Sequence, residues 1–365
     1  MVASGVASAV VMANIVAPVA AAEGAKSISE IDVMNTKIKS QTEEKDMKSH
    51  KNKLTSGVTA QSAALVLMAL LCTASCSVKK PAETTASPSP ALFATPEAAG
   101  QALQTAARAK DESGLAKIMG PGSEAIIHSG DTAEDQATLE SFVAKYDRMN
   151  RWVTMTDRSM ILYIGADNYP FPIPLATDAS SKWHFNTKAG EEEILARRIG
   201  RNELLAIDAV SAIANAEELY YQKPHDDNPA HQYTLLIISS SGKQDGLYWD
   251  VPEGQGFSPL GKLNDFAKAT SITPTETAFD GYSFRILSAQ GDQAKGGAKS
   301  FVMNGKMTAG CAVIASPVKY QDSGIMTFIL SREGTVYQKD LGPNTSAAAA
   351  SIDDYNPTAG WIPAE

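Results

Sequence analysis

Three arginines, Arg197, Arg198 and Arg201, form the densest group of charged side chains that a ligand could use. On a helix, Arg197 and Arg201 share a face at i, i+4, and Arg198 precedes Arg201 by three residues. Like charges at this spacing repel one another unless something neutralises them. Two interpretations follow. The arginines pair with nearby acidic residues, or they join two parts of the protein or bind an anionic partner.

His225, Asp226, Asp227 and His231 form the one metal-like cluster of the sequence. Imidazole and carboxylate groups at i, i+1, i+2 and i+6 can ligate a divalent cation. The alternative interpretation is a solvated loop that follows a helix. The chain contains no H-E-x-x-H, C-x-x-C, G-x-S-x-G or P-loop pattern. We therefore predict no catalytic residue and no cofactor.

Charge and cysteine content exclude two classes of protein. The chain has 41 acidic and 32 basic side chains and a net charge of -9, whereas nucleic-acid binding needs clustered Lys and Arg, so no nucleic-acid partner is expected. Three cysteines cannot build a disulfide scaffold. Cys311 lies within the apolar run AGCAVIA, which predicts a buried and unreactive thiol.

Residues 47–76 have the proportions of a secretory signal peptide. A lysine-rich start is followed by an apolar run from Ala63 to Leu71, which is too short to span a bilayer. The run ends at Thr73-Ala74-Ser75-Cys76, which resembles a bacterial lipobox, although Thr73 stands where leucine is usual. The resemblance implies that Cys76 is lipidated and becomes the mature N-terminus. An ordinary cleaved signal with an incidental cysteine is the alternative.

The segments on either side of this signal are not expected to fold. A signal peptide should begin the protein, so Met47 is the expected start, and residues 1–46 are a mis-called or disordered extension. Residues 77–91 are dominated by Pro, Ser, Thr and Ala and predict a flexible tether. A lipid anchor with such a tether would hold a globular body at a membrane surface.

Residues 92–188 are predicted to form an N-terminal α+β domain. Thr95 is a good N-cap with Pro96 at the first helical position, and two further helices are expected around 115–119 and 132–146. Four short strands follow at 152–155, 160–164, 171–176 and 182–186. This order resembles the cone-like fold of the nuclear-transport-factor-two superfamily, which by itself implies no function.

Residues 189–365 are predicted to form a second domain, with a long helix packed on an antiparallel sheet. The helix is expected over about 191–222, with an apolar stripe that includes Leu204, Ile207, Val210 and Ile213. Its polar back is expected to include Asn202 and Asp208. A second helix is expected at 231–238. The expected strands lie at 282–289, 300–303, 310–316, 326–331 and 335–339, and Tyr282, Phe284 and Ile286 should face the helix. Overall we predict an α+β fold.

Several sequence motifs carry resemblances to known families. The segments YPFPIP (169–174), RRIGRNE (197–203), GKQDGLYW (242–249) and GTVYQKDLG (334–342) resemble a bacterial family known as domain of unknown function 2950. That resemblance implies no activity, ligand or catalytic residue. The helix pattern AIDAVSAI (206–213) and the strand GYSFRI (281–286) resemble the head of type IV pilins and pseudopilins, which also place a long helix across an antiparallel sheet.

The sequence as a whole favours a lipid-anchored protein of the cell envelope that binds or supports a partner. The expected location is exported and membrane-anchored, facing the periplasm, and Ser77 after the cysteine favours the outer membrane in a cell with two membranes. The expected partners are the membrane, through the anchor, and an envelope protein. An envelope hydrolase or a metal-dependent enzyme that uses the His225–His231 loop or the cone-like N-terminal domain is the alternative.

Overall fold

The computed structural model describes residues 89–226, 230–252, 256–261, 269–332 and 334–364. The extension 1–46, the signal segment with Cys76 and most of the tether lie outside these residues. Within the described residues no helix is both long enough and apolar enough to cross a membrane.

Four helices open the described chain. They are α3 (Pro96–Arg108), α4 (Glu112–Met119), α5 (Glu124–Ile127) and α6 (Thr132–Arg148). The predicted cap is confirmed, since the Thr95 side chain accepts a hydrogen bond from the backbone N–H of Ala98 at 3.2 Å. Asp111 and Asp131 cap α4 and α6 in the same way. The sequence predicted three of these helices but not the short α5.

A five-stranded antiparallel sheet follows. Its strands are β1 (Asn150–Thr154), β2 (Met160–Ile164), β3 (Tyr169–Pro170), β4 (Leu175–Thr177) and β5 (Trp183–Phe185). They are ordered β1-β2-β4-β5, and β3 pairs with β2. The sheet and the four helices enclose one cluster of buried side chains, drawn from residues 99–194. The expected N-terminal α+β arrangement is therefore confirmed.

The long helix α7 (Thr187–Tyr221) begins at the N-cap Asn186. It belongs to both parts of the described chain. Ile194 is buried in the N-terminal cluster, whereas Ala206 and the buried residues after it belong to a second cluster that extends to residue 355. All described residues fall within a single compact unit. α7 is thus an element common to the two predicted domains.

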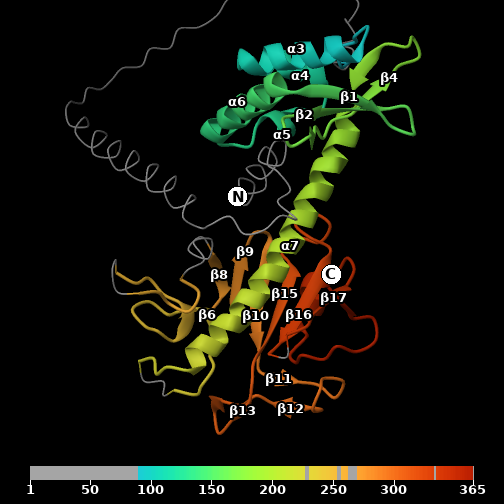
Figure 1. Ribbon diagram of the computed structural model, residues 1–365. Coiled ribbons are helices and arrows are strands. Elements are labelled where there is room, and N and C mark those ends of the chain that lie inside the picture. The colour runs from blue at the N-terminus through green and yellow to red at the C-terminus, as the bar shows by residue number, and fades with distance from the viewer. Residues whose placement is uncertain (1–88, 227–229, 253–255, 262–268, 333, 365) are drawn as a thin grey trace, which may run out of the picture. The chain divides into compact units, whose positions relative to one another are not determined.

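A seven-stranded antiparallel sheet forms the main element of the C-terminal part. Its order is β18-β17-β16-β15-β10-β9-β8. The strands are β8 (Thr270–Thr273), β9 (Glu276–Phe279), β10 (Tyr282–Leu287), β15 (Ala312–Pro317), β16 (Met326–Ser331), β17 (Val336–Asp340) and β18 (Ile362–Pro363). Figure 1 shows α7 lying across β10, β15 and β16. The predicted packing of a long helix on an antiparallel sheet is confirmed.

Short elements complete this part. They are β6 (Leu236–Ile238), β7 (Gly246–Tyr248), β11 (Ala289–Gln290), β12 (Lys299–Ser300), β13 (Val302–Met303), β14 (Lys306–Met307) and α8 (Thr345–Ala350). β6 pairs in parallel with β7. The helix predicted at 231–238 is therefore wrong. An apolar run as short as Leu235–Ile238 has no period that separates a helix from a strand.

Candidate functional site

The arginine cluster lies on α7, and Arg197 contacts the N-terminal part. Its Nε donates to Glu193 Oε1 at 2.7 Å, the i, i+4 pairing that the spacing allows. Its Nη1 donates to the Tyr169 hydroxyl at 3.0 Å and to the Pro170 carbonyl at 2.9 Å. Arg197 therefore fixes α7 to β3, the start of the YPFPIP segment.

Arg198 points to the C-terminal part instead. Its Nε donates to the Asp322 carbonyl at 3.1 Å and its Nη2 to the Asp322 carboxylate, which also contacts Lys319 Nζ at 3.1 Å. One helical turn further on, Asn202 Nδ2 donates to the Ser323 carbonyl at 2.9 Å. Glu203 Oε1 accepts from the backbone N–H groups that open β16, Ile325 at 2.9 Å and Met326 at 3.0 Å. The RRIGRNE motif thus binds the turn before β16.

These contacts change the sequence interpretation of the helix. Asn202, on the predicted polar back, is only 5% exposed, and Leu204, on the predicted apolar stripe, is 49% exposed. The turn before β16 covers one polar face of α7, so that face is buried through hydrogen bonds. Arg201 is half-buried, and burial lowers its pKa while Asp280 opposes that shift. Anion binding by Arg197, Arg198 and Arg201 stays a prediction.

Breaking the Arg198–Asp322 contact should destabilise the fold measurably. The two side chains are 13% and 29% exposed, so Arg198→Ala and Asp322→Ala should each cost about 1–3 kcal/mol. The double variant should cost less than the sum by about 1 kcal/mol or more, because the first change already removes the interaction. Denaturant unfolding of the four proteins measures this coupling. The exposed pair Arg108–Asp147 is the control and should show a coupling below about 1 kcal/mol.

The histidines of the predicted metal cluster lie against different tyrosines. The buried ring of His225 stacks on Tyr220, with ring centroids 4.2 Å apart, and burial lowers its pKa. His231 packs edge-on against Tyr221 at 5.2 Å. The Asp226 carboxylate accepts the backbone N–H of Gln244. Asp227 lies outside the described residues.

Across the described part of the chain, no three His, Cys, Asp or Glu side chains are grouped so that they could hold a metal ion. His225 and Asp226 have the contacts of a structural loop end instead. The four-residue metal site, which needs Asp227, stays a prediction.

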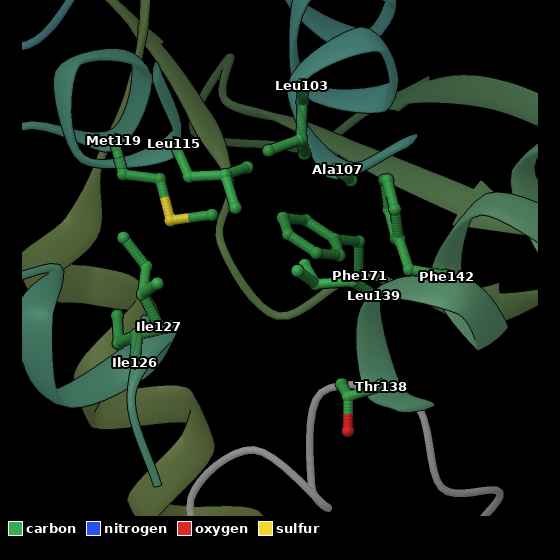
Figure 2. A pocket seen from close by; sticks show the side chains of 10 residues that line it. All are labelled: Leu103, Ala107, Leu115, Met119, Ile126, Ile127, Thr138, Leu139, Phe142 and Phe171. Carbon is green, nitrogen blue, oxygen red and sulfur yellow. The ribbon is translucent and has the colours of Figure 1, made fainter. Parts of the chain in front are cut away.

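An apolar pocket lies among α3, α4, α5, α6 and the segment after β3 (Figure 2). Its volume is about 30 Å³, and Thr138 is the one polar residue among the ten that line it. Figure 2 shows the Thr138 hydroxyl pointing away from the other nine side chains. Phe142 and Phe171 form one wall, with ring centroids 5.4 Å apart. The pocket holds space for about one water and no group that could bind one, so it is a gap in the core packing.

A larger groove lies on the face of the seven-stranded sheet opposite α7. On β10, Phe284 and Ile286 face the helix, so the alternate residues Ser283 and Arg285 face away from it. The groove has a volume of about 420 Å³ and is bounded by the β8–β9 hairpin on one side and α8 on the other. Glu276 of β9 and Arg285 lie in it. It is an open groove that combines charged, hydroxyl and apolar side chains.

Sequence reasoning missed a buried carboxyl group on α7. Glu217 is 0% exposed, and its Oε2 accepts the backbone N–H of Thr234 at 3.2 Å. Its Oε1 has no hydrogen-bond partner. Burial raises the pKa of Glu217 well above its usual range. The spacing contained a signal, because Glu217 lies four residues after Ile213 and three before Tyr220, both of which face the core.

These parts define an α+β protein in which one long helix joins a helical, five-stranded part to a seven-stranded antiparallel sheet. Residues 91–363 match the family described as "Protein of unknown function (DUF2950)", and the chain belongs to this family. The resemblance predicted from the motifs is therefore confirmed. No protein with a curated description and no solved structure matches the chain. The resemblance to pilin heads stays a prediction.

Proposed function

We propose that the protein is an exported, lipid-anchored component of the cell envelope that acts by binding a partner. The anchor rests on the sequence: a short signal, Cys76 at its end and a tether over 77–91. At the end of the predicted tether, the Ala91 N–H donates a hydrogen bond to the Lys117 carbonyl at 3.0 Å.

The open groove is the main observation that supports the proposed binding role. The conspicuous charged side chains of α7 are used inside the protein, by contacts that hold the N-terminal sheet and the turn before β16 to the helix. The groove instead presents charged and hydroxyl groups on a surface that the fold leaves uncovered. Its polar groups are held by neighbours of their own, as suits recognition of a ligand.

Cys76→Ser should release the protein from membranes. One acylated cysteine supplies nearly all of the membrane affinity expected here, since the chain carries a net negative charge that anionic lipid repels. Fractionation of cells that express the full chain measures the change. Cys72→Ser is the matched control, because it lies in the same signal segment and should leave the protein with the membranes. Retention of the Cys76→Ser protein after a salt wash would show that the anchor is not Cys76.

A further inference from the structure

The groove opposite α7 has the size of a small-molecule site. Its volume of about 420 Å³ falls within the roughly 300–1,000 Å³ typical of ligand pockets. Its floor is formed by β10 and β15, and α8 covers the sheet on one side only. The β8–β9 hairpin bounds the groove on the other side.

Two opposite charges face each other across neighbouring strands in this groove. Glu276 on β9 and Arg285 on β10 are direct partners in the antiparallel register, where opposite charges usually pair. Both are described residues that line the groove, yet no ion pair joins them. The Glu276 carboxylate accepts the Ser283 hydroxyl instead. A carboxylate and a guanidinium therefore occupy neighbouring positions on the two strands, and neither neutralises the charge of the other.

Arg285 is fixed by the end of α8. Its Nη2 donates to the Ala349 carbonyl at 3.0 Å and to the Ile352 carbonyl at 2.7 Å. The nearest carboxylate, Asp353, lies 4.0 Å from Nη1 and is 91% exposed. The guanidinium is therefore held in place by neutral carbonyls, and its positive charge remains available to a ligand carboxylate.

The rest of the groove combines hydroxyl groups with an apolar rim. Thr273, Thr275 and Ser316 contribute hydroxyls, and the exposed side chains of Ile272 and Val318 lie at the rim. The register of β8 shifts between Ser271 and Thr273, and such a bulge lets the consecutive residues Ile272 and Thr273 both line the groove. An apolar group of a ligand would find contacts beside the charged floor.

We propose that this groove binds a small zwitterion of the amino-acid or short-peptide class. The ligand's ammonium group pairs with Glu276, its carboxylate pairs with Arg285, and its side chain packs against Ile272 and Val318. A ligand with a single charge would leave the other protein group without a ligand charge of opposite sign, whereas a zwitterion satisfies both. This inference rests on the binding role proposed above and gives that role a ligand class.

Calorimetric titration of the purified full chain tests the proposal. The probes are L-alanine, alanyl-alanine and alanyl-alanyl-alanine, whose charges lie progressively further apart, together with N-acetyl-alanyl-alanine and alanyl-alanine amide. We expect one of the three unmodified probes to bind best. If alanyl-alanine binds, acetylation and amidation should each weaken binding about tenfold or more, because each removes one charged contact. If alanine or the tripeptide binds best, the same comparison is made with the acetylated and amidated forms of that probe.

Variants test the ammonium contact and the location of the site. Glu276→Gln should weaken binding of the unmodified ligand about tenfold and should make the protein insensitive to acetylation of the ligand, while amidation keeps its effect. Ser316→Phe should abolish binding by filling the groove without a change of charge. Asp147→Asn, on an exposed carboxylate of the N-terminal part that does not line the groove, is the control and should leave the affinity unchanged. Circular dichroism shows whether each variant is folded.

Two results would overturn the zwitterion site. One is no binding of any unmodified probe at millimolar concentration, and the other is equal binding of the acetylated and free ligands by the folded wild-type chain. Neither result contradicts the proposed membrane anchor, because fractionation of the Cys76→Ser protein tests the anchor separately. Conversely, a chain that binds the ligand but never fractionates with membranes refutes only the anchor.

Discussion

Ile213→Asp should unfold the C-terminal part of the protein. Ile213 is 0% exposed on α7, within the cluster that includes Phe284 and Phe328 of the sheet. A carboxylate placed there has no partner, which costs several kcal/mol, and the lost apolar packing adds about 2–5 kcal/mol. Domains of this size are stable by only about 5–15 kcal/mol, so the change removes most of that margin. Urea unfolding followed by circular dichroism measures the loss.

Two other positions on the same helix provide the comparison. Asp208 is exposed, so Asp208→Ala should change the free energy of unfolding by a few tenths of a kcal/mol. Ile207 is half-buried, so Ile207→Asp should fall between the two. The apolar spacing alone treats Ile207 and Ile213 as equals, and their different exposure separates them. Equal, small effects at 208 and 213 would mean that α7 does not pack on the sheet.

Sequence periodicity predicted the regular parts of the fold well. β16 begins and ends where the alternation indicated, and α3 begins after its predicted cap, because local propensity and burial agree there. The predicted exposures of Asn202 and Leu204 on α7 are wrong, because there the local pattern and the burial disagree. Asn202 is buried by a turn about 120 residues away, as its contact with Ser323 shows, and no local pattern in the helix encodes that turn. Leu204 is exposed although it shares the apolar spacing.

The groove was missed because the hairpin that bounds it was missed. β8 and β9 contain no clear alternation of apolar and polar residues. One signal was present, however: Asp280-Gly281 separates β9 from β10, and both residues have positive φ, 43° and 78°, as two-residue hairpin turns require. With that turn recognised, Glu276 and Arg285 fall opposite each other. The contact of Arg285 with α8 still depends on a segment 64 residues further along the chain.

Glu217→Gln should make the protein less sensitive to a rise in pH. The folded protein holds the Glu217 proton more tightly than the unfolded chain does, because burial raises the pKa. The stability linked to this proton is fully present below about pH 4.3, the usual pKa of glutamate, and is lost as the pH rises through the folded pKa. Between these two pKa values, the free energy of unfolding of the wild type should fall by up to about 1.4 kcal/mol per pH unit because of Glu217 alone.

The groups around Glu217 do not offset its charge. The Cys311 thiol is buried, and its pKa is raised by burial and by Glu217, so it stays neutral beside the carboxyl group. The Tyr233 hydroxyl is also buried without a hydrogen-bond partner, and burial raises its pKa. Arg332 pairs with the neighbouring Glu218, with 3.3 Å between Nε and Oε2. Ionised Glu217 would therefore lie in the core with a single backbone donor, Thr234.

The test compares the free energies of unfolding of the wild type and Glu217→Gln at a series of pH values. Glutamine keeps the shape and the oxygen that accepts the Thr234 N–H, so near pH 4 the variant should be about as stable as the wild type. Near pH 8 it should be the more stable of the two, since it has no proton to lose. Glu218→Gln is the matched control, because that side chain is 40% exposed and its difference from wild type should vary little over this range. Parallel pH profiles for wild type and Glu217→Gln in urea melts would show that Glu217 is ionised, or solvated, in the folded protein.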